Sequence, residues 1–402
     1  MPLPGWLVRR KTVPEPVQNY SVADPVLATL LGFSPDGAPI VSEHTALTLS
    51  AVWRAVSLIS GAVAGLSLRV MQETDDGQRV RVPSFLDNPG GREGLTRFEW
   101  VELVMTHLLL HGNAFLQHGR NGAGAMAALY PVHPACVSVE EDASRPGGKR
   151  FELRDLKGDL IVFDARTMTH VTALSLDGLR GVSPLTTARQ SMGTSLSGDK
   201  AAHKTFVNGA MVSGLVTPDE DLSEPEAAAI KAGLTARMQG TDNAGQVAVI
   251  NRKLKFQAWS QSAVDAQFLQ SRAFQVEEVA RWFGLPPHLL GQVEKQTSWG
   301  TGVAEQNRGL ARYTLTPWTT RIEQRLTRLL PAGRFAEFDY ASFIKPAPEV
   351  EIGLLLQEIA GGLLAVNEAR QIRHLPPVPG GDTPTLPPGH SVSPPGSTEG
   401  AP

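Results

Sequence analysis

The segment Asp265 to Gly291, DAQFLQSRAFQVEEVARWFGLPPHLLG, joins a strongly patterned helix to an abrupt stop. Apolar residues recur along it every three or four positions: Leu269, Ala273, Val276, Ala280 and Phe283. This spacing puts them on one face of a helix, which we expect to pack along its whole length. Gly284 ends the helix, and Pro286-Pro287 cannot continue it because each ring fixes φ and lacks a backbone donor. A rigid turn should follow.

Composition limits the class of protein. The chain has 402 residues, 42% hydrophobic and 19% charged, which suits two or three packed globular units. A net charge of −3 argues against a protein that holds DNA by bulk attraction, because such proteins neutralise many phosphates with clustered Lys and Arg. No apolar stretch is long enough for a membrane span. Prolines, not an apolar core, follow Arg9-Arg10-Lys11, so a signal peptide is not expected.

The single cysteine, Cys136, excludes an intrachain disulfide and a cysteine-based metal site. It lies in HPACVSV, which is typical of a strand, and we expect it to be a buried structural residue rather than a nucleophile.

Between irregular, proline-rich ends, helices alternate with short strands in an α+β pattern, without a regular βαβ rhythm. A first core helix should bury apolar residues at helical spacing: Leu49, Val52, Val56, Ile59, Val63 and Leu66. Asp75-Asp76-Gly77 predicts the turn of a hairpin between Leu68–Met71 and Arg79–Val82. Thr96 with Glu99 forms a capping box for a helix that runs to Leu110 and ends at Gly112.

Six short segments then predict one small antiparallel sheet: Asn113–His118, Ala128–Tyr130, Val137–Val139, Phe151–Arg154, Leu160–Phe163 and His170–Ala173. From Pro184 to Asn208 a single helix of about 35 to 40 Å is expected, carrying Leu185, Ala188, Met192, Leu196 and Phe206 on its apolar face.

The middle of the chain predicts a smaller helix and two strands. Ser223 with Glu226 is a second capping box, and Gly240 follows the helix. Strands Gln246–Ile250 and Leu254–Trp259 should flank Asn251-Arg252-Lys253. A long helical pattern covers roughly Thr301 to Leu330.

Four motifs invite a catalytic interpretation, and each has a better structural one. Gly193 to Lys200 nearly spells a phosphate-binding loop, but Asp199 stands where lysine is required. Gly122 to Ala127 is better explained as a turn than as a dinucleotide fingerprint. His107 and His111 lie one helical turn apart but lack the glutamate of HExxH, so histidines at the edge of a core are favoured over metal ligands. Ser183 precedes a proline, which favours a helix N-cap over a nucleophile.

Seven ordered segments carry a resemblance to a known family. Besides the helix and loop quoted above they are TALTLSAVWRAVSLISGAVAGLSLRV, TRFEWVELVMTHLLLHGNAFLQHGR, LYPVHPACVSV, DGLRGVSPLTTAR, FVNGAMVSGLV and NEARQIRHLPPVPGGD. Their order and spacing, from about Thr45 to Asp382, resemble the portal proteins of tailed bacteriophages, specifically the HK97-like portal family. Portals are rings at one capsid vertex through which DNA enters and leaves the phage head.

The resemblance implies a portal fold with wing, stem, clip and a reduced C-terminal crown. The implied divisions are a flexible N-terminal arm (1–44), the N-terminal part of the wing (45–183), a first stem helix (184–208), the clip (209–260), a second stem helix (261–284), a tunnel loop (285–298), a wing helix with the C-terminal part of the wing (299–345), a short crown-like helical region (346–375) and a Pro-rich disordered tail (376–402).

The implied function is a non-enzymatic portal ring, usually of twelve subunits. It would sit at the portal vertex of the virion after assembly in the host bacterial cytoplasm, as the channel for packaging and ejection of double-stranded DNA. Its partners would be the major capsid protein, the large subunit of terminase and the head–tail adaptor, with no membrane and no cofactor. A gene transfer agent or a prophage would use the same protein.

The resemblance also assigns candidate site residues, none of them catalytic or metal-binding. Tunnel-loop residues expected to meet DNA are Gln292, Glu294, Lys295, Gln296 and Thr297. Stem residues facing the channel or a neighbouring subunit are Arg189, Lys200, Lys204, Arg272 and Arg281. For most of these, a solvated or intersubunit salt bridge is the favoured role, opposite Asp199, Asp265, Glu277 and Glu278. Candidate clip contacts to terminase or adaptor are Asn251, Arg252 and Lys253.

The alternative function is a nucleic-acid-processing enzyme, either a nuclease or a packaging-motor subunit. Such an enzyme needs acidic metal ligands or an intact phosphate loop, and neither is evident in the sequence.

Overall fold

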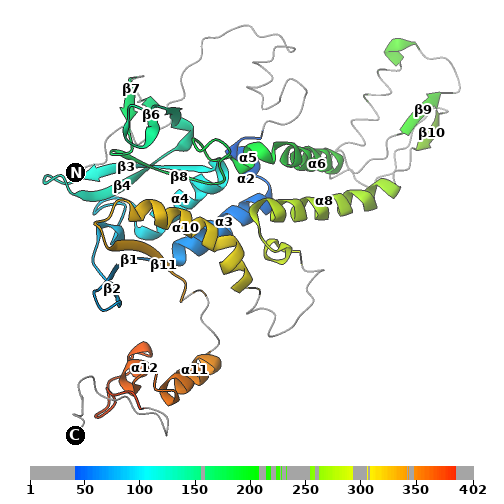
Figure 1. Ribbon diagram of the computed structural model, residues 1–402. Helices are drawn as coiled ribbons and strands as arrows, with labels where there is room; N and C mark the ends of the chain where they lie inside the picture. The colour runs from blue at the N-terminus through cyan, green and yellow to red at the C-terminus, as the bar shows by residue number, and fades with distance from the viewer. Residues whose placement is uncertain are drawn as a thin grey trace, which may run out of the picture. The chain divides into compact units, whose positions relative to one another are not determined.

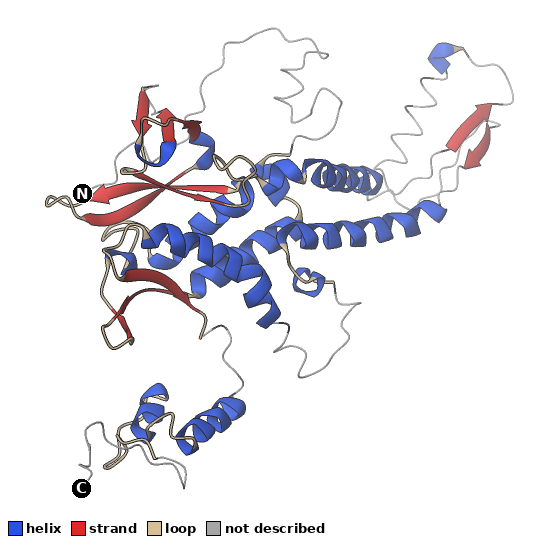
Figure 2. Ribbon diagram, viewed as in Figure 1, coloured by secondary structure: helices blue, strands red, loops and turns tan. Residues whose placement is uncertain are grey.

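The computed structural model describes residues 41–154, 159–207, 214–218, 223–226, 228, 232, 254–258, 262–292, 306, 308–341, 343 and 348–385. The chain divides into two units, which we describe separately: residues 1–298 with 309–339, and residues 299–308 with 340–402. Helices and strands are mixed along the chain, in agreement with the predicted α+β class (Figures 1 and 2). None of the described helices has the length and apolar character needed to cross a membrane.

Helix α3 (Ser50–Gly65) forms the predicted core helix. Every residue assigned to its apolar face is buried: Leu49, Val52, Val56, Ile59, Val63 and Leu66. It packs against α4 (Arg97–His111), which lies beside it in Figure 1. The short helix α2 (Glu43–Leu47) precedes α3 and is capped by Ser42, whose hydroxyl accepts a hydrogen bond from the backbone N–H of Thr45 at 3.2 Å.

Helix α4 begins and ends where the sequence predicts. The hydroxyl of Thr96 accepts from the backbone N–H of Glu99 at 3.3 Å, and the Glu99 carboxylate accepts from the Thr96 N–H at 2.8 Å. Gly112 ends the helix with a φ of +68°. The fully buried Trp100 donates its indole N–H to the carbonyl of Leu129 at 2.7 Å, which fixes α4 to the adjacent sheet.

The predicted hairpin is present and gains a third strand. Strands β1 (Ser67–Glu73) and β2 (Arg79–Arg81) are antiparallel, and Gly77 in their turn has a φ of +76°. Strand β11 (Arg334–Asp339) pairs antiparallel with the other edge of β1. Buried partners in this register are Leu68 with Phe338 and Val70 with Ala336.

The six strands after α4 form two sheets, so the prediction of one sheet is wrong. Their bounds are β3 Asn113–Arg120, β4 Met126–Val132, β5 Val137–Glu141, β6 Lys149–Arg154, β7 Leu160–Phe163 and β8 Met168–Thr172. Both edges of β3 are used, by β4 and β8, so β5, β6 and β7 make a separate antiparallel sheet. Apolar side chains from the two sheets share one core: Phe115, Val132, Val137, Phe151, Leu153, Phe163 and Met168.

Cys136 is exposed, which corrects the expectation of a buried strand residue. It is the last residue of a 3-10 turn, η2 (Pro134–Cys136), and strand β5 starts only at Val137. The buried side chain at this point is that of Val137, so the turn moves the inward-facing position by one residue.

The predicted helix from Pro184 to Asn208 is broken. Helix α5 (Pro184–Thr187) ends at Ala188, whose φ of −86° and ψ of 8° lie outside the helical region, and α6 (Arg189–Val207) then follows. Ser183 is the predicted N-cap: its hydroxyl accepts from the Thr186 N–H at 3.2 Å and donates to the carbonyl of Leu110 at 2.8 Å. Helix α8 (Ser262–Phe283) matches the second predicted long helix.

The helical pattern predicted from roughly Thr301 to Leu330 is present in its described part, which is helical from 308 to 327. Within it a π-helical segment, η6 (Leu310–Leu315), precedes α10 (Thr316–Thr327). A 3-10 turn, η5 (Pro287–Leu290), lies earlier, in the loop after α8. Pro317 lacks the N–H that an α-helix would donate to the residue four positions earlier, which accounts for the wider π turn before it.

In the middle of the chain, the predicted strand Leu254–Trp259 is present as β10 (Leu254–Ala258). It pairs antiparallel with β9 (Gly214–Pro218), a strand that the sequence did not indicate. The Ser223 N–H and hydroxyl both donate to the Glu226 carboxylate, and the N–H contact is one half of the predicted capping box. Gly240, Gln246–Ile250 and Asn251–Lys253 lie outside the described residues.

The second unit contains α11 (Pro348–Ala360) and α12 (Val366–Ile372). The side chain of Asn367 accepts from the Val378 N–H at 2.8 Å and donates to the Val378 carbonyl at 3.0 Å. Its backbone N–H donates to the Gly381 carbonyl at 2.8 Å. The start of the segment predicted as a disordered tail is therefore attached to α12.

We expect Gly112→Ala to destabilise the first unit by about 2 kcal/mol or more, because a left-handed φ is unfavourable for alanine. A Cβ here would also lie 2.2 Å from the Val182 carbonyl oxygen. The control is Gly61→Ala in α3, where no heavy atom lies within 4 Å of the added carbon and helix propensity favours alanine by up to about 1 kcal/mol. Urea unfolding at one protein concentration measures both, and equal shifts would contradict this account.

Candidate functional site

The long helices α6 and α8 run side by side (Figure 1). Near its end α8 buries Val279, Ala280 and Phe283, but Ala273 and Val276 are only partly buried. Within the chain, the predicted apolar stripe is therefore buried only near the end of the helix, and packing along its whole length stays a prediction. Its buried residues lie in the last two turns, and both α3 and the following turn η5 contact this helix.

Polar contacts join the two helices further along. The guanidinium of Arg272 lies 2.9 Å from the carboxylate of Asp199, and both side chains are about half exposed. Ser191 donates a hydrogen bond to Glu278. An exposed ion pair contributes at most about 1 kcal/mol, so these contacts align the helices more than they stabilise them.

The predicted charged residues on these helices have different surroundings. Arg189 and Lys200 are exposed on α6, and the side chain of Lys204 is not described. Arg281 lies 3.8 Å from Glu277 and stacks over the ring of Phe274 at 5.1 Å. Arg272 and Arg281 thus have acidic partners within their own chain.

Contacts with α3 and α8 hold the turn that follows α8 in place. Leu285 is buried beyond Gly284, whose φ is +66°, and Arg54 of α3 donates to the carbonyl of Leu289 at 3.3 Å. Gln292 returns to α8, where its amide donates to the carbonyl of Ala273 at 3.4 Å. The other candidates lie outside the described residues: Glu294, Lys295, Gln296 and Thr297 in the loop, and Asn251, Arg252 and Lys253.

Two motifs rejected at the outset have ordinary structural roles. Gly193 to Lys200 lies within α6, so this segment does not form a phosphate-binding loop. Gly122 to Ala127 includes the turn between β3 and β4, where Gly124 has a φ of +80°.

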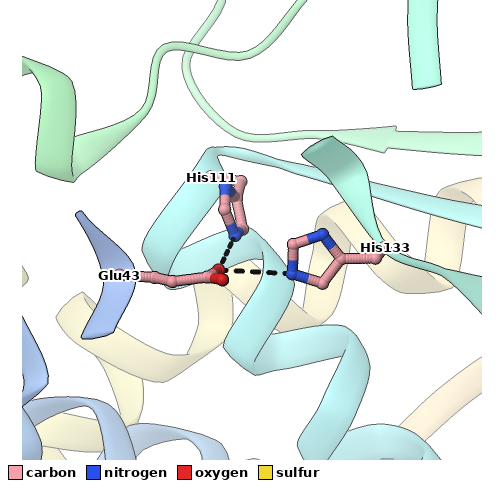
Figure 3. A group of neighbouring side chains, drawn as sticks. All are labelled: Glu43, His111 and His133. Carbon is pink, nitrogen blue, oxygen red and sulfur yellow. Dashed lines mark hydrogen bonds and ion pairs between the residues drawn. The ribbon is translucent and has the colours of Figure 1, made fainter. Parts of the chain in front are cut away.

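A cluster of polar side chains surrounds Glu43 of α2 (Figure 3). Nε2 of His111 lies 2.8 Å from Oε2 of Glu43, and Nε2 of His133 lies 3.2 Å from the same oxygen. Nε2 of His44 lies 3.8 Å from Oε1. One ligand atom from each of Glu43, His111 and His133 falls within 4.8 Å of the others, a group that could hold a metal ion.

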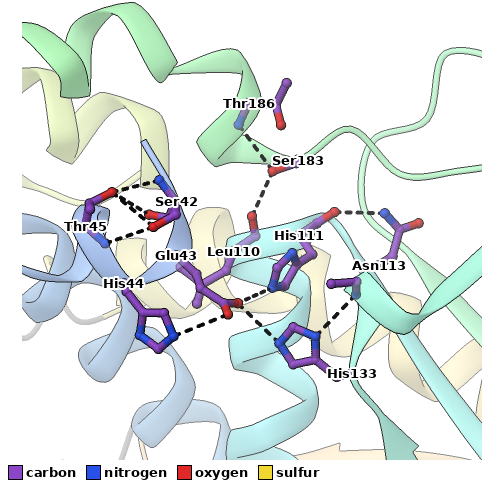
Figure 4. Close-up of polar contacts among 11 residues, drawn as sticks. Ser42, Glu43, His44, Thr45, Leu110, His111, Asn113, His133, Ser183 and Thr186 are labelled. Atoms are coloured by element: carbon purple, nitrogen blue, oxygen red, sulfur yellow. Dashed lines mark hydrogen bonds and ion pairs between the residues drawn. The ribbon is translucent and has the colours of Figure 1, made fainter. Parts of the chain in front are cut away.

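Local structure fixes each member of this cluster (Figure 4). Ser42 caps α2, and Glu43 is the first residue of that helix. His111 is the last residue of α4, where Gly112 ends the helix. His133 is the N-cap of η2, and its Nδ1 accepts from the backbone N–H of Ala135 at 3.3 Å.

Burial and mutual charge set the ionisation of the cluster. Burial raises the pKa of Glu43, but His133, His111 and His44 together outweigh it and leave that pKa below its ordinary value. Burial lowers the pKa of His111 despite the opposing effect of Glu43. The pKa of His107 falls to about 3, first through burial and then through His133 and His111. Burial therefore disfavours the protonated form of both His107 and His111.

His107 and His111 were singled out from the sequence, but Glu43 and His133 were not. His107 is buried at the edge of the core, as expected. Glu43 lies 68 residues from His111 and 90 from His133, so no local motif joins the three. Only the docking of α2 against α4 and η2 brings them together.

A second buried histidine lies between β3 and β8. The ring of His170 stacks on Phe115 with centroids 4.4 Å apart, and its Nε2 lies 2.9 Å from Oδ1 of Asn113. That oxygen also accepts from the Gly181 N–H at 2.8 Å, so it acts as acceptor and the histidine Nε2 carries the proton. Burial, reinforced by Lys149, lowers the pKa of His170 to about 3.

Comparison with known proteins gives one consistent result. A family model described as "Phage portal protein" matches residues 50–373. The probable portal protein of Streptomyces phage phiC31 is 34% identical over 374 residues, which are 89% of this chain and 81% of that protein. The portal protein of Enterobacteria phage HK97 is 31% identical over 394 residues, 94% of this chain and 90% of that protein.

Solved structures show a similar fold. An HK97 family phage portal protein from Corynebacterium diphtheriae has a TM-score of 0.58 at 20% identity, over 77% of this chain and 99% of that one. A chain in the neck of a native gene transfer agent particle, computed with C12 symmetry, has a TM-score of 0.54 at 23% identity, over 89% of this chain and 100% of that one.

Acid should destabilise the protein through its buried histidines. The pKa values of His107 and His170 are about 3 in the folded chain, against an ordinary 6.5. Between these pH values the unfolded chain therefore binds more protons than the folded chain. The free energy of unfolding is highest above pH 6.5 and decreases as the pH falls towards 3. At pH 5, each of the two histidines should have lowered the free energy of unfolding by roughly 2 kcal/mol.

The measurement is urea unfolding at pH 7 and pH 5, for the wild type and for His107→Leu, whose side chain does not titrate. The variant should lose roughly 2 kcal/mol less than the wild type between the two pH values. An identical loss in both proteins would show that His107 does not contribute.

Proposed function

The chain belongs to the phage portal protein family, and on that premise we propose that it forms a closed ring that carries double-stranded DNA through one capsid vertex. The observation that carries this proposal is the match to the HK97 portal protein over 94% of the chain, long helices included. The resemblance to HK97-like portals noted in the sequence is thereby confirmed. The gene transfer agent neck computed with C12 symmetry supports twelve subunits.

In this proposal α6 and α8 are the stem helices, and β9 and β10 belong to the clip. The sheets and helices of residues 45–183, together with α10 and β11, form the wing, and α11 and α12 form a short crown. Exposed apolar side chains support a ring. Phe274 is 52% exposed, Trp282 40% and Tyr313 76%, which is typical of surfaces that a neighbouring subunit covers.

A channel of mixed charge suits DNA that must slide. The net charge of −3 gives little bulk attraction for phosphate, so contacts between the ring and DNA stay weak. In the loop after α8, Lys295 is the candidate for direct phosphate pairing, with Gln292, Glu294, Gln296 and Thr297 as polar neighbours. Gln292 lies against α8, so the loop should enter the channel beyond it.

The proposed role is structural, with no catalytic step. The partners are the major capsid protein, the terminase large subunit and the head–tail adaptor, the last two docking at the clip around Asn251, Arg252 and Lys253. The ring would occupy the portal vertex of the virion after assembly in the host cytoplasm. The alternative, a nuclease or motor subunit, finds no support in the one segment that resembled a phosphate loop, because that segment is helical.

The purified protein should form rings with a central hole, most often of twelve subunits. Negative-stain electron microscopy, with mass photometry for the subunit number, tests this directly. A chain that stays monomeric across salt, pH and protein concentration would sink the proposal, and a bound nuclease-type metal with DNA cleavage would favour the alternative.

Charge reversal in the loop should weaken DNA retention. Lys295→Glu replaces an attractive contact with a repulsive one, and we expect fewer DNA-filled particles while ring assembly is unchanged. Arg92→Glu, at an exposed wing position, makes the same change in net charge and is the control. Equal packaging and retention by Lys295→Glu and wild type would remove this residue from the DNA path.

A further inference from the structure

We propose that Glu43, His111 and His133 together bind one divalent transition-metal ion, with Zn²⁺ as the best match. Two imidazole nitrogens and one carboxylate oxygen form a ligand set that Zn²⁺ accepts, with its remaining position open to water or another ligand. All three residues belong to one chain, so the site does not depend on ring assembly or on the proposed function.

The distances suit an ion placed between the three atoms. Zinc bonds of about 2.0 to 2.1 Å in tetrahedral geometry put neighbouring ligand atoms about 3.3 Å apart. The two nitrogens already lie 2.8 and 3.2 Å from the Glu43 oxygen, and all three atoms fall within 4.8 Å of one another. To admit the ion, the contacts to Glu43 would lengthen slightly, and the two nitrogens, which lie within 4.8 Å of each other, would settle at about 3.3 Å; rotation about the side-chain bonds allows both.

The site is partly enclosed and has an open side. The Glu43 side chain is 18% exposed, that of His111 22% and that of His133 39% (Figure 3). An ion could therefore enter from solvent and keep a water. His44 is 70% exposed, its Nε2 lies 3.8 Å from Oε1 of Glu43, and it could supply a fourth ligand.

An ion pair alone explains this cluster poorly. Four imidazoles surround a single carboxylate when His107 is included, since its ring lies 5.4 Å from that of His133. Nε2 of His111 and Nε2 of His133 both lie against the same Glu43 oxygen, so three potential ligand atoms converge where a simple ion pair would need two. An unprotonated imidazole nitrogen offers a lone pair, which is what a metal ion requires.

Binding has an identifiable cost. In the absence of metal, Nδ1 of His133 accepts from the Ala135 N–H, so its proton sits on Nε2 and faces Glu43. Coordination through Nε2 moves that proton to Nδ1 and breaks the contact with Ala135. This contact is long, at 3.3 Å, and Ala135 is exposed, so water can replace it. Arg180 also opposes a cation near His111, and we therefore expect micromolar rather than nanomolar affinity.

A bound ion would join three separate parts of the first unit. Glu43 lies on α2, close to the start of the described chain, while His111 ends α4 and His133 starts η2. The ion would fasten α2 to the sheet-bearing body in place of two hydrogen bonds. It would act as a structural ion that positions the N-terminal segment.

The test uses the full-length protein after dialysis against chelator. Isothermal titration with Zn²⁺ should give one site per chain, and Co²⁺ should give the visible absorption bands of a low-coordinate site with nitrogen and oxygen ligands. Two single variants test the ligands: Glu43→Gln, which keeps the side-chain shape, and His111→Asn. Each should lower Zn²⁺ affinity at least tenfold. His374→Asn removes an exposed histidine in the second unit and should bind like the wild type.

Thermal unfolding separates loss of the site from loss of the fold. Zn²⁺ should raise the Tm of the wild type and of His374→Asn, and should leave the Tm of a folded Glu43→Gln unchanged. A wild-type chain with no Zn²⁺ site, or equal binding and equal Tm shifts in Glu43→Gln and His111→Asn, would overturn the proposal.

Discussion

The close contact between Gly112 and Gly181 is the constraint on which the arrangement of the first unit depends. A Cβ on Gly181 would lie 1.9 Å from the Gly112 carbonyl oxygen. The two backbone segments therefore approach so closely that no side chain fits between them. Asn113 fixes the contact by donating to the Gly181 carbonyl at 2.9 Å and accepting from its N–H at 2.8 Å. The Gly112 carbonyl also accepts from the N–H of Ala173, which connects the end of α4 to the residue after β8.

This contact lies directly before the short helix α5, which leads to the long helix α6. Residues 181–183 lead directly from Gly181 into α5, and Ser183 donates to the carbonyl of Leu110 at the end of α4. Helix α5 therefore starts from a point held against the body, while α6 contacts α8 through an exposed ion pair and a partly buried hydrogen bond. A helix pair anchored at one end and weakly packed along its length is suited to a ring, where neighbouring subunits complete the packing.

The same region carries the unusual polar chemistry. His111 immediately precedes Gly112, and His170 hydrogen-bonds to Asn113, so both histidine environments are attached to the end of α4. Asn113 thus links the glycine contact to His170, and His111 is the residue directly before that contact.

The sequence by itself determined the local elements and the family. Periodic apolar residues identified the buried face of α3, a capping box and a glycine located both ends of α4, and Asp-Gly marked the first hairpin, because each depends on residues within a few positions of one another. The ordered segments from Thr45 to Asp382 were enough to indicate a portal. The same local rules could not show that Ala188 breaks a helix or that Cys136 precedes its strand.

Only the tertiary structure decided the long-range contacts. The pairing of β1 with β11, the division of six strands into two sheets, and the meeting of Glu43 with His111 and His133 join residues far apart in the chain. Their partners are selected by the packing of whole elements, such as the α4 side chains buried against β4 and the core shared by the two sheets. The spacing of residues along the sequence does not show which distant segments will pair. Bringing two such segments together costs loop entropy, and the contacts that offset this cost are made by whole helices and strands rather than by a local pattern.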